Sequence, residues 1–337
     1  MKGRSYATAL GILLGFTLPL LAAEPATPPR MPDSYAKPGT LVSLADGRQL
    51  NLRCVGSGRL TVLLEAGSHA DSSSWFRVQP LLAGHFRVCA YDRAGFGFSA
   101  EGPLPRNLDA DVADLHALIR QAKLDTPLVL VGHSLGTNIV RQYAQRYRAD
   151  VAALVLVDPP AQDIAAVAPA WAAQDAQMNA QRLAFVRQCA QAAEQGKLAA
   201  PAPALSACVA GPSPLASAAV NDAARANKLK PAFWHALLSE LESNAAVFAK
   251  PVPADASLGD IPLRVLTASD TYAAAPPADR KALETARDRT HERIVASSTR
   301  GQRQQVAQSS HDMPLDQPEV IAKAVLQVAA ETTGAAH

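Results

Sequence analysis

Short runs of apolar residues alternate along the chain with segments of helical periodicity. Eight runs predict strands, because each is either continuously apolar or alternates between apolar and polar positions. In chain order they are TLVSL, QLNLRCV, LTVLLEAG, FRVCAYD, LVLVGHS, ALVLVDP, LRVLTAS and RQQVAQ. Helical patterns occupy about residues 107–123, 137–147 and 317–331. This order predicts an α/β fold with a mostly parallel eight-stranded sheet and helices on both faces.

Residues 159–260 differ from the rest of the chain. They are rich in Ala, Gln and Pro and carry helical periodicity without a convincing strand. We therefore expect a helical cap insertion at 159–260, which divides one core domain into residues 40–158 and 261–333.

The N-terminal segment has the pattern of a secretory signal peptide. Lys2 and Arg4 precede an apolar run from Ala7 to Leu21, and a Pro-rich linker follows at residues 24–39. A membrane anchor is the alternative, but this run is interrupted by Pro19 and falls short of the roughly 20 apolar residues that span a bilayer. We expect residues 1–23 to be removed and the protein to be exported, periplasmic or secreted, with no integral membrane span after processing.

Charge excludes some classes of partner. The chain has 32 Lys and Arg against 30 Asp and Glu, and residues 1–23 contribute two of the basic residues and no acid. The mature chain would thus be close to neutral, so nothing indicates a nucleic-acid or anionic-membrane surface.

A serine between two glycines stands where a strand pattern meets a helix pattern, in Gly132-His133-Ser134-Leu135-Gly136. A sharp turn there would expose the Ser134 hydroxyl at the carboxyl edge of the sheet, where ligands of α/β proteins bind. Glycine lacks the Cβ that would collide when the strand and helix backbones approach closely. The N-terminus of the next helix would direct free N–H groups at developing negative charge. These features predict a nucleophilic serine.

The helix that follows is expected to be amphipathic. Its apolar stripe consists of Ile139, Val140, Tyr143, Ala144 and Tyr147. The residues expected mostly to face outward are Arg141, Gln145, Arg146 and Arg148.

From about residue 40 to 330 the sequence resembles the α/β-hydrolase superfamily. The matching motifs, in chain order, are LLEAGSHADSSSW, YDRAGFGFS, GHSLG, ALVLVDP, LRVLTASD and SSHDMPLDQPEVI. The resemblance implies that Ser134 is the nucleophile, His311 the base, and the backbone N–H groups of Leu135 and Ser68 the oxyanion hole. We also expect His69 and Trp75, in and after the oxyanion loop, to line the substrate pocket.

The position of His311 also favours its role independently, because it lies in a loop between a late strand and the final helix, downstream of Ser134. The acid of the triad has two candidates, Asp270 after LRVLTAS and Asp158 after ALVLVD. We favour Asp270, because the superfamily usually places its acid after the later strand, and keep Asp158 as the alternative. The long separation from His311 predicts an extra helix around ADRKALETARDR.

The four cysteines show no CxxC spacing, which argues against a zinc site and, in an exported protein, favours two disulfides. In the superfamily's sheet, the strands that match QLNLRCV and FRVCAYD are neighbours, which implies a Cys54–Cys89 bond. Cys189 and Cys208 both lie in the insertion, and we expect them to pair with each other.

The chemistry that the resemblance implies is acyl transfer through a Ser-His-Asp triad, without a cofactor or metal. The expected function is an exported serine esterase acting on a small-molecule carboxylic ester. Amide or peptide, lactone and C–C bonds remain alternative substrates. A non-catalytic protein that uses the fold to bind a small ligand is the alternative from another class.

Overall fold

The computed structural model describes residues 29–209 and 211–333, and the predicted signal peptide lies outside these residues. Eight strands form one sheet in the order β1-β2-β4-β3-β5-β6-β7-β8. The first two are antiparallel to their neighbours, and the other pairs are parallel. The strands are β1 (Thr40–Ser43), β2 (Gln49–Val55), β3 (Thr61–Glu65), β4 (Arg87–Tyr91), β5 (Leu128–His133), β6 (Val151–Val157), β7 (Leu263–Ala268) and β8 (Gly301–Val306). All eight predicted strands are confirmed.

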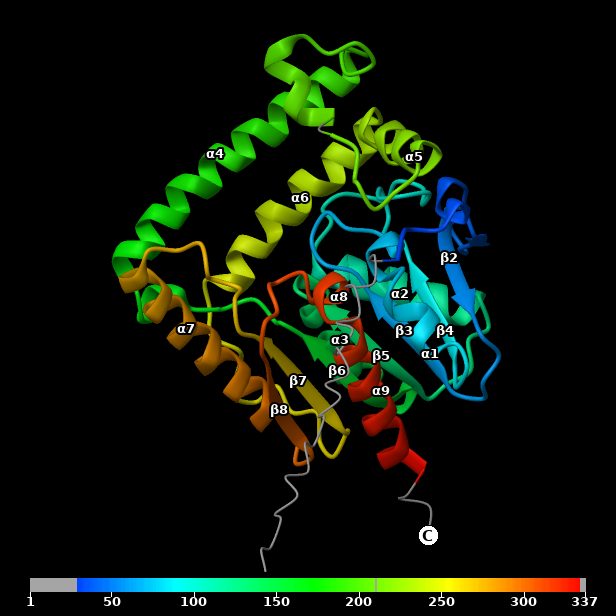
Figure 1. Ribbon diagram of the computed structural model, residues 1–337, viewed down its shortest axis with the longest axis vertical. Helices are drawn as coiled ribbons and strands as arrows, with labels where there is room; N and C mark the ends of the chain where they lie inside the picture. Colours follow the sequence, from blue (N-terminus) through cyan, green and yellow to red (C-terminus); the bar gives the residue numbers. More distant parts are fainter. Residues whose placement is uncertain (1–28, 210, 334–337) are drawn as a thin grey trace, which may run out of the picture.

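Helices cover both faces of the sheet (Figure 1). On one face α2 (Leu108–Gln121) and α3 (Leu135–Arg146) bury their apolar sides against Leu128 and Leu130 of β5. On the other face α1 (Val78–Leu82) and α9 (Pro318–Thr333) pack against Val129 and Val131 of the same strand. The alternation of β5 side chains explains why its run is continuously apolar, since both faces are buried.

The remaining helices of the core lie near β8. Helix α7 (Pro277–Ala296) is the extra helix predicted between the two late strands, and it packs against β7 and β8. Helix α8 (Met313–Asp316) follows the β8 loop and leads into α9. Short 3-10 helices are η1 (Asp33–Ala36), η2 (Ser72–Trp75), η3 (Arg148–Asp150), η4 (Ile164–Ala166) and η5 (Pro203–Val209).

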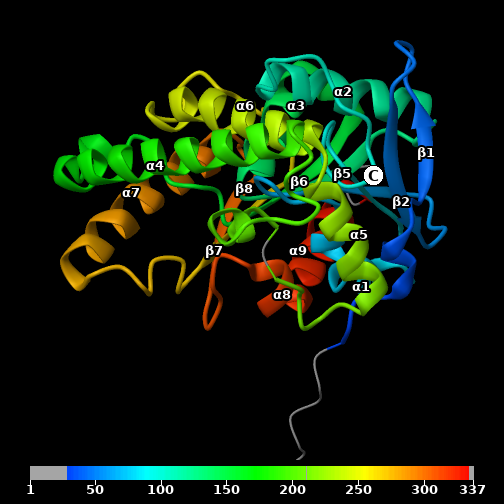
Figure 2. The same cartoon turned by 90° about the horizontal axis from the view of Figure 1, so that it is seen from above.

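The segment between β6 and β7 is helical, as the sequence predicts. It contains α4 (Pro169–Glu194), α5 (Ala218–Lys228) and α6 (Pro231–Phe248). Helices α4 and α6 lie side by side, and Figure 2 shows them running together across the top of the molecule. Their facing residues and η5 form a separate apolar cluster that includes Cys189, Cys208 and Trp234.

The sheet order decides which loops meet. Because β5, β6 and β7 are parallel neighbours, the turns after them open at the same edge of the sheet. Ser134 follows β5 directly and Asp158 follows β6 directly, so the two residues lie one strand apart.

Candidate active site

The turn at Ser134 has the strained geometry that its glycines predict. Ser134 caps α3 with φ 50° and ψ −122°, a backbone conformation that non-glycine residues rarely adopt. A Cβ at Gly132 would lie 2.6 Å from the carbonyl oxygen of Gly136. A Cβ at Gly136 would lie 2.6 Å from the carbonyl oxygens of Glu65 and Ala66. The turn therefore requires glycine at both positions.

Ser134, His311 and Asp158 form one hydrogen-bonded chain. The Oγ of Ser134 is 2.9 Å from His311 Nε2, and His311 Nδ1 is 2.7 Å from Asp158 Oδ2. Asp158 also accepts from the Ala268 N–H at 3.1 Å and from the Thr271 hydroxyl at 2.6 Å. Because a carboxylate only accepts, Nδ1 of His311 carries the proton and Nε2 is free to accept from the serine. This is the tautomer in which His311 can act as a base toward Ser134.

The surroundings of Asp158 keep its carboxyl group ionised, so that it can accept a hydrogen bond from His311 Nδ1. Its side chain is 1% exposed, whereas that of His311 is 38% exposed and reaches the site from the loop after β8. Burial acts to raise the pKa of Asp158, but hydrogen bonds from His311 and Thr271 outweigh burial and leave this pKa below its usual value. The acid is thus ionised at neutral pH.

Asp270, the acid that the sequence favours, does not contact His311 in the structure. Asp270 is exposed, and its backbone N–H donates to Ser309. Its neighbour Thr271 turns inward instead and donates to Asp158. The physical reason is the conformation of the chain after β7, which turns Thr271 toward Asp158 and leaves Asp270 exposed at the surface. The alternative acid, Asp158, is the one that contacts His311.

His133 supports the loop that carries His311. Its Nε2 lies 2.7 Å from the backbone oxygen of His311, so the neutral ring donates this hydrogen bond from Nε2. Burial and the neighbouring His311 lower the pKa of His133 to about 4. Trp75 packs edge-on against the other side of this ring, with centroids 6.4 Å apart.

The backbone N–H groups predicted for the oxyanion hole lie next to Ser134. Leu135 opens α3, so its N–H has no partner within the helix. A Cβ added to Gly67 would lie 3.3 Å from the Ser134 Cβ, which brings the loop containing Ser68 against the serine. Within the described chain the Ser68 N–H donates no hydrogen bond.

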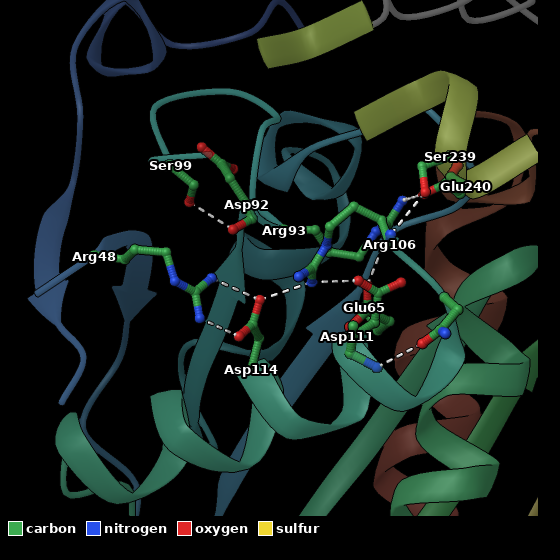
Figure 3. A network of polar contacts seen from close by, with 12 residues as sticks. Arg48, Glu65, Asp92, Arg93, Ser99, Arg106, Asp111, Asp114, Ser239 and Glu240 are labelled. Atoms are coloured by element: carbon green, nitrogen blue, oxygen red, sulfur yellow. Dashed lines mark hydrogen bonds and ion pairs between the residues drawn. The ribbon is translucent and has the colours of Figure 1, made fainter. Parts of the chain in front are cut away.

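A buried arginine, Arg93, holds this loop, and it belongs to the polar network drawn in Figure 3 together with Glu65 and Glu240. Arg93 follows β4 and donates to the carbonyl oxygens of Ala66 at 2.8 Å and Gly67 at 2.7 Å. The same guanidinium pairs with Glu65 at 2.7 Å and with Glu240 at 2.9 Å. Burial would lower the pKa of Arg93, but the two carboxylates raise it, so it stays charged.

Glu240, in the helical insertion, also holds the oxyanion loop. One carboxylate oxygen accepts from the Ser68 hydroxyl and from the His69 N–H at 3.1 Å, while the other accepts from Arg93. Helix α6 therefore contacts the oxyanion loop through a fully buried acid. Sequence reasoning missed this residue. The available signal was an acid on the buried face of an amphipathic helix, one turn after Ala236 and Leu237.

A cavity of about 440 Å³ opens beside the oxyanion loop. Ser68 and His69 line it on the side of the oxyanion loop. The other lining residues belong to the insertion, among them Phe185, Phe233, Leu237 and Leu241. His69, which we expect to line the substrate pocket, lines this cavity. Trp75 does not line it: its side chain is fully buried in the core and packs against His133.

Both predicted disulfides are present. Cys54 pairs with Cys89 across the register of β2 and β4, and Cys189 pairs with Cys208 inside the insertion. The second bond links α4 to η5, and Cys208 also lines the cavity. No group of His, Cys, Asp or Glu side chains in the described chain is arranged to hold a metal ion. Nor does any helix of residues 29–209 and 211–333 have the length and apolar character needed to cross a membrane.

Comparisons with known proteins agree with this architecture. A family model described as the alpha/beta hydrolase fold matches residues 61–200. A thermophilic esterase from Thermogutta terrifontis superposes with TM-score 0.57 at 20% identity, covering 87% of this chain and 98% of that one. A serine hydrolase involved in carbazole degradation gives TM-score 0.59 at 19% identity, covering 86% and 98%.

Curated relatives match a shorter part of the chain. An uncharacterized protein of Bacillus subtilis, YqjL, is 33% identical over 110 residues, which is 33% of this chain and 44% of that protein. Two Pseudomonas putida proteins follow. N-formylmaleamate deformylase is 34% identical over 36% of this chain and 45% of its own length, and 2-hydroxy-6-oxo-2,4-heptadienoate hydrolase is 33% identical over 38% and 46%. This chain thus matches less than half the length of each of these three relatives.

Proposed function

Because this chain belongs to the α/β-hydrolase superfamily, we propose that it is a serine hydrolase that cleaves a carboxylic ester through an acyl-enzyme on Ser134. The observation that carries this proposal is the hydrogen-bonded chain from Ser134 through His311 to Asp158. A serine hydroxyl is a poor nucleophile unless a base lies within hydrogen-bonding distance, and the 2.9 Å separation meets that requirement.

In the first half of the reaction His311 Nε2 takes the proton of Ser134 as the Oγ attacks the substrate carbonyl. Asp158 keeps His311 in the required tautomer and stabilises the imidazolium that forms. The N–H groups of Leu135 and Ser68 donate to the oxyanion of the tetrahedral intermediate. His311 then returns the proton to the leaving alcohol, and water activated by the same ring releases the acid and restores Ser134.

The cavity beside the loop supports a small-molecule substrate with an apolar portion. Phe185, Phe233, Leu237 and Leu241 line it, and the insertion supplies most of the wall. We propose that these residues set the preferred size of the acyl or alcohol group. Arg182 and Lys228 also line the cavity, and no acidic residue does, so an ester with a neutral or anionic substituent fits better than a cationic one.

Other bonds remain secondary candidates. The names of the two Pseudomonas putida relatives indicate deformylation and hydrolysis of a heptadienoate, and the thermophilic esterase has the same fold. Amide, lactone or C–C cleavage would use the same serine. A non-catalytic ligand-binding role is less favoured, because all three triad side chains are in hydrogen-bonding contact.

We also propose that the protein is exported. Two disulfides support an oxidising compartment, and the charged and apolar pattern of residues 1–23 supports a cleaved signal peptide.

The test of the function is the hydrolysis of p-nitrophenyl esters of increasing acyl length by the purified protein and by Ser134→Ala. We expect turnover by the native protein and a loss of several orders of magnitude in kcat for the variant, provided its circular dichroism spectrum is unchanged. Equal turnover by the two proteins would contradict the proposal. Binding of an ester without turnover would favour the non-catalytic alternative.

A further inference from the structure

Arg141 on α3 is buried, although the helical pattern predicts that it faces outward. It is 6% exposed, and its one hydrogen bond in the described chain is a long contact of 3.2 Å from Nη1 to Asn138 Oδ1. Its Nε is buried without a partner. The expectation was wrong because the chain that follows α6 returns over this part of α3, which a pattern local to the helix does not reveal.

The other buried arginines of the described chain all have carboxylate partners. Arg93 pairs with Glu65 and Glu240, Arg106 with Asp111 and Asp114, Arg264 with Glu331, and Arg287 with Asp288. Arg141 forms no ion pair within residues 29–209 and 211–333. Since an unpaired buried charge is costly, the fold otherwise provides a counter-charge wherever an arginine is buried.

Burial lowers the pKa of Arg141 to about 10, and no carboxylate raises it again. The guanidinium therefore remains charged at neutral pH. Asp109, on the neighbouring α2, is not its partner, because this carboxylate accepts from Gln142 and Arg146.

A cavity of about 250 Å³ lies against Arg141, between α3 and the chain from Val247 to Ala256. We call it the Arg141 cavity. Lys250 supplies a second cation, and none of the described residues that line the cavity is acidic. Side-chain amides come from Asn138, Gln142, Gln145 and Gln162. The Asn138 Nδ2 is also buried without a partner.

We propose that the Arg141 cavity binds a small oxyanion, through its carboxylate or phosphate group, with Arg141 and Lys250 as the counter-charges. A guanidinium is suited to this role, because its N–H groups match the oxygens of such anions. The unpartnered Nδ2 of Asn138 adds a donor without adding charge. The site is separate from the cavity beside the oxyanion loop, since the two share no lining residue.

The experiment measures thermal stability and binding heat without any ester, so its result is independent of the proposed hydrolase activity. The full chain is titrated with sodium phosphate, sodium sulfate or sodium acetate, each against sodium chloride at equal ionic strength. We expect a saturable rise in Tm of roughly 5 °C with a preferred anion, and a calorimetric stoichiometry of one. Response to phosphate and sulfate assigns a tetrahedral anion, and response to acetate assigns a carboxylate.

The decisive variant is Arg141→Met, which keeps an unbranched apolar stem and removes the guanidinium and its charge. It should lose the anion-dependent shift, while Arg146→Met, an exposed arginine on the same helix, should keep it. An unchanged shift in Arg141→Met, or no saturable response in the native chain, would overturn the proposal. If Arg141→Met does not fold, Lys250→Gln decides: at least threefold weaker binding supports the site, and unchanged binding overturns it.

Discussion

Asp158 Oδ2 lies 2.7 Å from His311 Nδ1, and the same carboxylate is held by a backbone N–H and a hydroxyl from the end of the neighbouring strand. Groups other than His311 therefore also fix the position of this carboxylate. This arrangement orients the imidazole toward Ser134 and makes the identity of the acid testable.

Replacing Asp158 with Asn should lower kcat by on the order of 10⁴, because the amide can donate and would favour the wrong tautomer of His311. Asp270→Asn is the matched control, since it changes an exposed aspartate after the adjacent strand. Its kcat should stay within about twofold of the native value, as for other surface substitutions. Ester hydrolysis by both folded variants decides the matter, and a larger loss at Asp270 would reverse the assignment.

Glu240→Gln should lower kcat by roughly tenfold or more with little change in KM, because the loop that carries the Ser68 N–H would lose its charged anchor. It should also reduce the free energy of unfolding by about 3–5 kcal/mol, since Arg93 would lose one of its two buried partners.

Glu242→Gln on the same helix is the control for Glu240. Its pair with Arg187 is about half exposed on both sides, so its loss should change stability by less than about 1 kcal/mol. Steady-state kinetics and urea unfolding of both variants provide the measurement. Equal effects at the two positions would show that Glu240 does not position the loop.

His133 should make stability depend on pH in acid. Its pKa is about 4 in the folded protein and near 6.5 when unfolded, so between these values the unfolded chain binds more protons. Stability from this group therefore falls as pH drops from about 6.5 to about 4, by about 3 kcal/mol in total.

Other buried groups titrate in the same range, and Glu65, whose pKa burial raises to about 7, acts in the opposite direction. The test is therefore a comparison of urea unfolding at pH 7 and pH 4 for the native protein and His133→Gln. The glutamine keeps a donor for the His311 carbonyl and does not titrate. The native protein should lose about 3 kcal/mol more than the variant. Equal losses in the two proteins would contradict the prediction, and the exposed His85→Gln serves as control.

Changes in the wall of the cavity beside the oxyanion loop should alter which esters are preferred. Phe233→Ala removes a large ring from the wall and should shift the optimum toward longer acyl groups, with a severalfold change in the ratio of kcat/KM values. Met178→Ala, an exposed residue of α4 outside this cavity, should leave the ratio unchanged. A small fluorophosphonate should label both variants at the native rate, and slower labelling of Phe233→Ala would indicate damage to the triad instead.

The sequence reveals the elements that repeat a simple pattern. Continuously apolar runs identify the buried strands, and glycines at 132 and 136 identify the turn at Ser134, because the steric requirement is local. The position of its loop after the last strand is the feature that points to His311. The superfamily's strand order also led to the correct Cys54–Cys89 pair.

Features that depend on packing between distant segments could not be predicted from local sequence patterns. Asp158 and Asp270 both follow strands that end at one edge, and only the inward turn of Thr271 separates them. Trp75 lies under His133 rather than in the cavity, although its position in the sequence adjoins the oxyanion loop. Arg141 is covered by chain more than 100 residues later. The position of each of these side chains is determined by contacts with segments far away in the sequence.

The most direct test of the account is the site of covalent labelling by a fluorophosphonate. The native protein is treated with the probe, digested and analysed by mass spectrometry, with Ser134→Ala treated in parallel. We predict a single phosphonylated residue, Ser134, and no adduct in the variant, because this is the serine whose Oγ lies 2.9 Å from an oriented imidazole. An adduct on another serine, or an unlabelled native protein that still hydrolyses esters, would contradict the assignment of Ser134 as the nucleophile.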